Sequence, residues 1–257
     1  MIFVGDGALL RRAVVHAAAG GYPIDLVCSA DPADAAGTAP HLFVATGPGT
    51  GSGSGPGFGS APGASRSAGD GSGAGINAHA DTLAAASTDG IVWSVNNRRI
   101  FRQPLLSRDL RLYNIHNGLL PQHRGLPSVA VLYALLRGET EYGATLHEVD
   151  AGIDTGRVLA ERRFPVGPED RYHEVMLRGI RACQALFEEH LPAVAAGRPA
   201  PAPAPDRAAG PPAYYGLRAL AGLPGQVGHP AYARATDLGP FAAHAPEVAE
   251  AVRHLAA

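Results

Sequence analysis

Lysine is absent from this chain of 257 residues, and all 21 of its basic side chains are arginine. This absence excludes Schiff-base chemistry on a lysine and the lysine of a phosphate-binding P-loop. The 23 acidic side chains outnumber the basic ones and give a net charge of −2. No basic field is therefore available to attract a polyanion, and we do not expect a nucleic-acid partner.

Cysteine and long apolar runs are also scarce. The two cysteines, Cys28 and Cys183, stand far apart in the sequence. They cannot form a disulfide framework, a zinc ribbon or a thioredoxin motif, so we expect a reduced, cytoplasmic setting. The longest apolar run, residues 129–136, is much shorter than the roughly 18 residues of a membrane helix, and no targeting signal precedes the first apolar segment. We therefore expect no membrane partner.

Two segments have a biased composition that predicts how the chain is divided. Residues 47–75 are rich in Gly, Ser and Pro, and they are too poor in apolar side chains to offset the entropy cost of ordering. Residues 198–213 alternate Pro and Ala, which is typical of a semi-rigid linker. We therefore predict a main domain over 1–197 that contains the loop 47–75, a linker over 198–213, and a small C-terminal element over 214–257.

The hydrophobic periodicity alternates between strand and helix patterns. The expected strands are 1–4, 24–28, 41–45, 91–95, 111–116, 142–149 and 157–166, and the expected helices are 8–19, 127–137 and 170–196. Pro127 marks the start of the second helix and Gly138 its end. Strands that alternate with helices predict an α/β fold with a mostly parallel sheet.

Candidate chemistry lies at the end of the predicted strand 111–116. Asn114 and His116 are two residues apart, so both side chains point to the same face of a strand. An amide donor can stabilise an oxyanion, and an imidazole can move protons near neutral pH, which is what acyl transfer requires. Asp154, in a later loop rich in Asp and Gly, is placed to orient His116. Asp150 on the same loop is the alternative, and the position next to Thr155-Gly156 favours Asp154.

Four ordered blocks in this region resemble the folate-dependent formyltransferases, a family that acts on methionyl-tRNA, glycinamide ribonucleotide or amino sugars. The blocks are Asn114-Ile115-His116, Leu119-Leu120-Pro121 with Arg124-Gly125, Gly143-Ala144-Thr145-Leu146-His147, and Asp150-Ala151-Gly152-Ile153-Asp154-Thr155-Gly156. The resemblance is strong over about 91–166. It implies the Rossmann-like formyltransferase fold, with helices flanking a mostly parallel sheet.

The resemblance also implies a donor, a reaction and a set of site residues. The donor is N10-formyltetrahydrofolate, whose formyl carbon is attacked by an acceptor amine while Asn114 and protonated His116 stabilise the oxyanion. No metal is implied. The catalytic residues are Asn114, His116 and Asp154, and the folate-binding residues lie in two loops: Asn97, Arg98, Arg99, Ile100 and Phe101 in one, and Asp150, Ala151, Gly152 and Ile153 in the other.

Departures from the family pattern narrow the choice of acceptor. The tRNA-specific members carry a basic C-terminal domain, whereas residues 214–257 offer only Arg218, Arg234 and Arg253. We therefore expect a small-molecule amine acceptor: an amino sugar, an amino acid derivative or a natural-product intermediate. The C-terminal element is expected to complete the acceptor site or to form a homodimer contact. Asn117-Gly118 replaces the usual Ser or Pro-Ser, which is expected to change the hydrogen bonding around the acceptor.

Other interpretations stand beside these. Gly5-Asp6-Gly7 and Asp31 resemble a dinucleotide fingerprint, which would indicate an NAD-dependent oxidoreductase, although Leu10 replaces its third glycine. A second alternative is a non-catalytic folate- or ligand-binding relative. Arg98-Arg99 is ordinarily a solvated pair, Asp150 can cap its own turn, and His123 and His147 can line a loop and a strand without binding metal.

Overall fold

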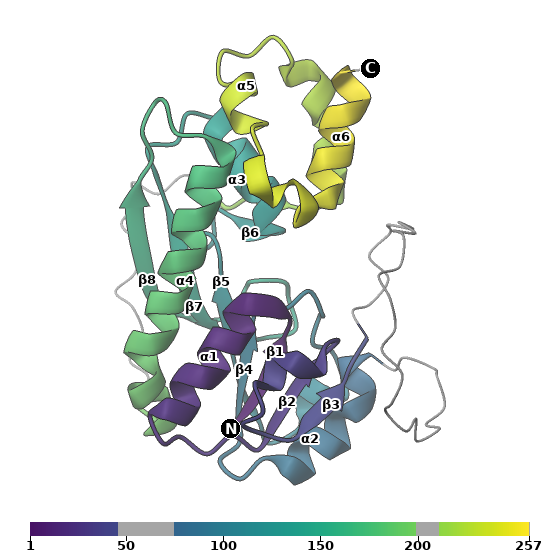
Figure 1. The fold of residues 1–257 in the computed structure, drawn as a ribbon, viewed down its shortest axis with the longest axis vertical. Coiled ribbons are helices and arrows are strands. Elements are labelled where there is room, and N and C mark those ends of the chain that lie inside the picture. Colours follow the sequence, from purple (N-terminus) through teal and green to yellow (C-terminus); the bar gives the residue numbers. More distant parts are fainter. Residues whose placement is uncertain (46–74, 199–210, 257) are drawn as a thin grey trace.

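The structure is a computed structural model that describes residues 1–45, 75–198 and 211–256; most of the predicted glycine-rich loop and linker lie outside these ranges. A seven-stranded sheet with the order β3-β2-β1-β4-β5-β7-β8 runs through the molecule (Figure 1). Its strands are β1 (Ile2–Gly5), β2 (Leu26–Ser29), β3 (His41–Phe43), β4 (Ile91–Val95), β5 (Arg111–His116), β7 (Glu141–Glu148) and β8 (Val158–Pro165). β1 to β5 pair in parallel, whereas β7 pairs antiparallel with both β5 and β8. The predicted mostly parallel α/β sheet is confirmed.

Helices cover both faces of the sheet, because its central strands are apolar on both sides. Phe3 and Trp93 point to the face covered by α1 (Gly7–Ala19) and α4 (Tyr172–Ala195). Val4 and Val92 point to the other face, where η2 (Ile76–His79), α2 (Ala80–Ala86) and η3 (Leu105–Ser107) pack. Among the described helices, none is long and apolar enough to span a membrane.

The C-terminal residues build a third apolar cluster with α3 (Pro127–Leu136) and the start of α4. They form β9 (Tyr214–Tyr215), η4 (Leu217–Gln226), α5 (Tyr232–Ala235), η5 (Gly239–Ala243) and α6 (Pro246–Ala256). β9 pairs in parallel with β6 (Arg124–Gly125), a short strand in the connection between β5 and α3. The C-terminal element is therefore attached beside the connection that follows β5.

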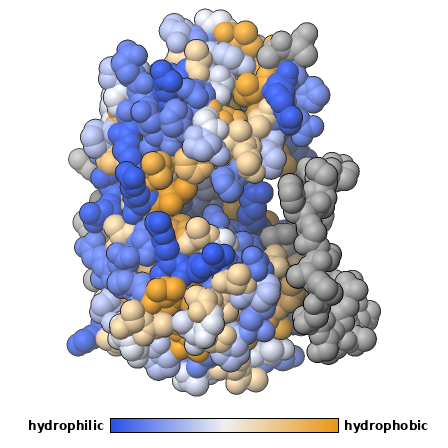
Figure 2. Space-filling model, viewed as in Figure 1, coloured by the Kyte–Doolittle hydropathy of each residue, from blue (hydrophilic) through white to orange (hydrophobic). Residues whose placement is uncertain are grey.

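The carboxyl ends of the parallel strands point toward the C-terminal element (Figure 1). The surface is hollowed between this element and the N-terminal half of the chain (Figure 2). In open α/β sheets, ligands bind beyond the carboxyl ends of the strands. The fold therefore directs attention to the residues at the ends of β4 and β5.

Candidate active site

Two neighbouring strands, β5 and β7, bring four polar side chains to one place. Asn114 is opposite His147 in the antiparallel register, and His116 is opposite Thr145. Opposite residues in an antiparallel pair point to the same face of the sheet. The pairing therefore adds His147 to the predicted residues Asn114 and His116.

The amide of Asn114 is fixed by the ring of His147. Nδ2 of Asn114 donates to Nε2 of His147 at 3.0 Å, and Nδ1 of His147 donates to the carbonyl of Glu148 at 2.7 Å. This pattern requires the neutral ring with its proton on Nδ1. Burial, followed by the nearby charge of His116, lowers the pKa of His147 below its usual value of 6.5. His147 is thus a residue that the sequence interpretation left on the strand and outside the site.

Asp154 lies between the two imidazoles. Its Oδ2 is 3.7 Å from Nδ1 of His116, and its Oδ1 is 3.7 Å from Nε2 of His147. The backbone of Asp154 adopts a φ of 52°, and its Oδ2 accepts a 2.8 Å hydrogen bond from the amide of Gly125. The structure therefore brings Asn114, His116 and Asp154 together, in an arrangement that aims a carboxylate at the proton-carrying ring.

His116 is held from its far side by the connection after β5. Its ring is 5% exposed, and Nε2 donates to the carbonyl of His123 at 2.6 Å. Because a carbonyl only accepts, Nε2 carries a proton. Nδ1 is consequently the nitrogen of His116 that faces Asp154 and can gain or lose a proton.

The first predicted folate loop, residues 97–101, follows β4. The side chain of Asn97 folds back onto it, accepting from the amide of Arg99 at 2.9 Å and donating to the carbonyl of Arg99 at 3.1 Å. Ile100 leaves 43% of its surface exposed, while Phe101 is buried in the core. The loop thus presents a rigid backbone and one apolar side chain.

The arginines of this loop do not form a solvated pair, so that interpretation is wrong for Arg99. Its guanidinium is buried, forms an ion pair with Asp6 at 2.7 Å, and donates to the carbonyl of Val44 at 2.5 Å. The side chain of Arg99 is therefore not available to bind a folate, and only the backbone of Arg99 can contact one. Arg98 is half-exposed and pairs with Glu247 of α6 at 3.3 Å.

The second predicted folate loop, residues 150–153, is a self-contained turn. Oδ1 of Asp150 accepts from the amide of Gly152 at 3.0 Å and from the hydroxyl of Thr155 at 2.6 Å. The carbonyl of Ile153 accepts from Nε of Arg124 at 2.8 Å. Asp150 therefore shapes the turn, as the turn-capping interpretation holds, and the exposed stretch 150–152 offers its backbone to a ligand.

The turn after β1 is filled by carboxylates, which contradicts the dinucleotide interpretation. Oδ2 of Asp34 accepts from the amide of Gly7 at 3.0 Å, at the start of α1. A pyrophosphate would need that amide. Asp31, the candidate ribose ligand, instead accepts from the amide of Ala33 at 2.8 Å.

Asn117 also lies elsewhere than expected. Its side chain is buried against α4, where Nδ2 lies 3.3 Å from the sulfur of Met176. A Cβ on Gly179 would lie 2.1 Å from Oδ1 of Asn117. The Asn117 side chain therefore contacts α4, and the effect of Asn117-Gly118 on hydrogen bonding around an acceptor stays a prediction.

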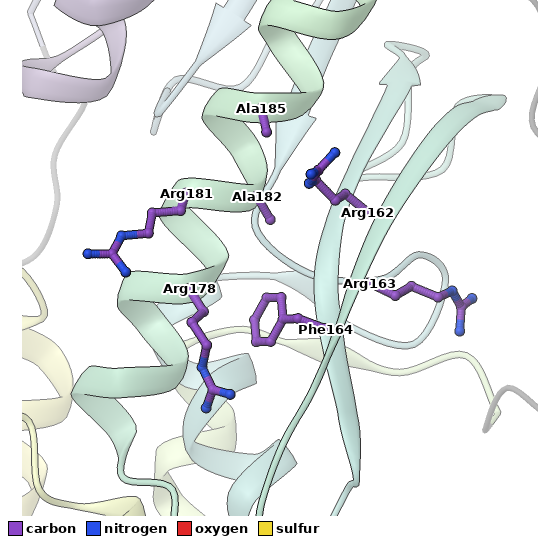
Figure 3. A pocket seen from close by; sticks show the side chains of 7 residues that line it. All are labelled: Arg162, Arg163, Phe164, Arg178, Arg181, Ala182 and Ala185. Atoms are coloured by element: carbon purple, nitrogen blue, oxygen red, sulfur yellow. The ribbon is translucent and has the colours of Figure 1, made fainter.

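A cavity of about 310 Å³ between β8 and α4 is separate from this site (Figure 3). It is lined by Arg162, Arg163, Phe164, Arg178, Arg181, Ala182 and Ala185. Arg163 and Arg181 point away from each other in Figure 3, and Arg163 pairs with Glu141 at 2.6 Å. The arginines therefore do not converge on a ligand. Within the described residues, no group of three or more His, Cys, Asp or Glu side chains is arranged to hold a metal ion.

Part of the chain matches a known protein family. Residues 66–190 match the family model described as formyl transferase. This match spans the carboxyl ends of β4 and β5, both candidate folate loops and most of α4. Residues 66–190 belong to the formyl transferase family.

One curated relative is the methionyl-tRNA formyltransferase of Halorhodospira halophila, 37% identical over 93 residues. The match covers 36% of this chain and 29% of that protein, so the chain spans less than a third of this relative's length. A second curated methionyl-tRNA formyltransferase, from Sorangium cellulosum, is 35% identical over 96 residues, or 30% of its length.

Solved structures show the same fold across most of the chain. A sugar N-formyltransferase from a Shewanella species has a TM-score of 0.64 and 15% identity, and the match covers 91% of this chain and 85% of that one. An N-formyltransferase from Helicobacter canadensis, solved with folinic acid and dTDP-3-aminofucose, has a TM-score of 0.54 and 16% identity, covering 84% and 70%. The formyltransferase fold thus extends beyond the matched family segment.

Proposed function

We propose that this protein is an N-formyltransferase that transfers the formyl group of N10-formyltetrahydrofolate to the amine of a small molecule. The observation that carries the proposal is the cluster of Asn114, His116, His147 and Asp154, which comes from β5, β7 and the loop after β7. It combines an oriented amide donor with a ring whose free nitrogen faces a carboxylate. Acyl transfer between nitrogen atoms needs both groups.

The two loops beside this cluster fit a folate. A pterin ring is flat and carries donors and acceptors on its edge, which suits a slot between an apolar side chain and exposed backbone. Ile100 supplies the apolar side chain, and residues 150–152 supply exposed backbone. In the proposal, 98–101 and 150–153 hold the pterin, mainly through their backbones. The folate, when bound, supplies the formyl group.

The cluster acts on the formyl carbonyl and on the attacking amine. Nδ2 of Asn114 donates one hydrogen to His147 and has a second hydrogen for the carbonyl oxygen as that oxygen gains charge. His116 keeps its proton on Nε2 and presents an unprotonated Nδ1 toward Asp154, where that nitrogen can take up a proton during the reaction. Asp154 orients this nitrogen. As the amine bonds to the formyl carbon it loses a proton to Nδ1 of His116 or, directly or through a water molecule, to Asp154. When the bond between the formyl carbon and N10 breaks, that proton passes to N10, and tetrahydrofolate leaves.

The acceptor is proposed to be a small amine and, among the classes considered, an amino sugar. The Shewanella neighbour is named as a sugar N-formyltransferase. The Helicobacter neighbour is named as an N-formyltransferase and was solved with dTDP-3-aminofucose. The described C-terminal element carries three arginines, of which Arg234 is bound to the carbonyls of Asp170 and Leu135. This leaves little positive charge for a tRNA, the acceptor named in the methionyl-tRNA relatives.

The domain assignment belongs to the same proposal. Residues 1–197 form the catalytic domain, and the C-terminal element completes the acceptor side of the site through β9 and α6. Its support is the pairing of β9 with β6, next to the amide that holds Asp154, and the ion pair between Arg98 and Glu247.

The test is release of tetrahydrofolate from N10-formyltetrahydrofolate in the presence of a panel of amino sugars, sugar nucleotides and amino acid derivatives. The wild-type protein should turn over with at least one amine. Asn114→Ala should lower kcat by about 10²–10³, because one oxyanion donor is lost. Gln184→Ala is the matched amide control, because Gln184 donates to Glu188 on the same helix, α4.

Release without any acceptor would mean hydrolysis and would contradict the transfer step. Equal rates in the wild type and Asn114→Ala would contradict the assignment of the oxyanion donor.

A further inference from the structure

The turn that supports His116 is itself built around a buried histidine, His123. The amide of His123 donates to the carbonyl of Leu119 at 2.8 Å, and the amide of Leu119 donates to Nδ1 of the His123 ring at 3.0 Å. The side chain and the backbone of His123 thus both hydrogen-bond to Leu119 and close the same turn. Since Nδ1 accepts a hydrogen bond, the proton of the neutral ring lies on Nε2.

That proton is directed at a carboxylate. Nε2 of His123 lies 2.7 Å from Oε2 of Glu139, which follows α3. The ring is 2% exposed and packs on Tyr142, with centroids 4.5 Å apart, whereas Glu139 is 26% exposed. Glu139 also lines a cavity of about 480 Å³ beside the C-terminal element.

The carbonyl of His123 is the group that receives the proton on Nε2 of His116, at 2.6 Å. A chain of hydrogen bonds therefore runs from Glu139 through His123 to the ring of His116. Each link has a defined direction: His116 donates to the His123 backbone, and the His123 side chain donates to Glu139. If the His123 carbonyl moved, the His116 ring would lose the bond that keeps Nδ1 turned toward Asp154.

We propose that His123 and Glu139 are positioning residues that fix His116 in the tautomer with a proton on Nε2, so that Nδ1 faces Asp154. The catalytic consequence rests on the proposed function, but the tautomer of His116 does not. A plain packing role for the His123 ring would be met by Tyr142 and the apolar cluster of α3. It would not require both ring nitrogens to be hydrogen-bonded, one of them to a carboxylate.

The experiment is 15N NMR of the protein labelled with 15N at its histidine rings, in the absence of substrate. The signals of His116 are identified as those that disappear in the His116→Gln variant. The variants are Glu139→Ala, which removes the acceptor, and Glu139→Gln, which keeps one. Glu169→Ala is the matched control, because Glu169 lines the same cavity and is exposed. Spectra are recorded well below the melting temperature of each variant. His123→Phe, which keeps the ring packing on Tyr142, is a second route to the same loss.

In the wild type, Glu139→Gln and Glu169→Ala, the His116 signals should show protonated Nε2 and unprotonated Nδ1. In Glu139→Ala and His123→Phe, they should show a mixture of tautomers. In acceptor-dependent turnover, kcat should fall about tenfold for Glu139→Ala, with KM changed less than about twofold. The reason is that the His116 ring is misplaced whereas substrate binding is unchanged. Glu139→Gln should restore most of kcat.

An unchanged His116 tautomer in both folded variants, Glu139→Ala and His123→Phe, would overturn the proposal. So would a fall in kcat that Glu139→Gln does not restore, or one that Glu169→Ala matches. If the protein failed to transfer formyl groups to any amine, the NMR result would still decide whether Glu139 and His123 position His116.

Discussion

The oriented amide of Asn114 depends on the neutral state of His147. A protonated His147 would carry hydrogens on both ring nitrogens and could no longer accept from Nδ2 of Asn114. Burial in the folded protein already disfavours this charged form, and the pKa of His147 is lowered. Protonation therefore acts against the hydrogen bond and against the fold at the same time.

The replacement His147→Gln should make stability less dependent on pH. Because the pKa of His147 is lower in the folded than in the unfolded chain, the unfolded state binds more protons below about pH 6.5, and stability falls as the pH decreases from there. Glutamine does not titrate and offers an oxygen to Asn114. Melting temperatures measured from about pH 7 to about pH 5 should fall less for the variant than for the wild type.

His254→Gln is the matched control, since His254 is 77% exposed and its loss should leave the wild-type pH dependence in place. Parallel curves for His147→Gln and the wild type would contradict a buried, neutral His147.

Individual site residues were predictable where a sequence motif identifies them, but not where the pairing of two strands brings them into the site. The strand end and the acidic loop predicted that Asn114, His116 and Asp154 would meet, and they do. His147 was missed because its role follows from the register between β5 and β7, which periodicity alone does not fix. The signal available in the sequence was the place of His147 on the strand that leads into the acidic loop of Asp154. Arg99 was misjudged because its partner, Asp6, is distant in the sequence.

At the scale of elements, α4 is fitted to the connection after β5 by a glycine. Gly179 lies in the middle of a helix of 24 residues, where glycine has a low helix propensity. The reason is the buried side chain of Asn117, which lies where a Cβ would be. Glycine at this position lowers the helix propensity of α4, but it leaves room for Asn117 to pack closely against the helix.

Gly179→Ala should therefore lower the free energy of unfolding by about 1–3 kcal/mol through overpacking. In the background of Asn117→Ala, where the space is open, the same change should be neutral or should stabilise the helix by up to about 1 kcal/mol. Denaturant unfolding of the wild type, both single variants and the double variant measures this. Equal effects of Gly179→Ala in the two backgrounds would show that the two positions do not interact.

Elements with a clear period were predictable and very short ones were not. The strand over Ile91–Val95 and the helix that begins at Pro127 have the bounds or the start that the sequence indicates. β6 and β9 have two residues each, too few for any pattern. The packing of the C-terminal element against α3 followed from neither periodicity nor a motif, and it depends on contacts between distant segments.

At the scale of the whole molecule, the two cysteines report on separate parts of the core. Cys28 lies in β2 on one face of the sheet, and Cys183 lies in α4 on the other. Burial raises the pKa of each thiol to about 12. Neither thiol should react with an alkylating reagent until the protein around it opens.

Alkylation near neutral pH should accordingly be slow for both thiols in the native protein and fast in denaturant. If the sheet opens as one cooperative unit, Cys28 and Cys183 should be labelled at the same slow rate, followed by mass spectrometry of the two peptides. Fast labelling of one cysteine beside slow labelling of the other would contradict a single cooperative unit.

Folate binding is the most direct test of the central claim that the loops at the ends of β4 and β7 form the donor site. The measurement is calorimetric titration with 5-formyltetrahydrofolate, a stable relative of the donor, with NAD titrated in parallel. We expect binding in the micromolar range, weakened by Ile100→Asp, which puts a charge where the pterin would pack. Val15→Asp, at an exposed apolar position on α1, should leave binding unaffected. NAD should not bind. Failure of the folate to bind, or binding of NAD in its place, would contradict the account.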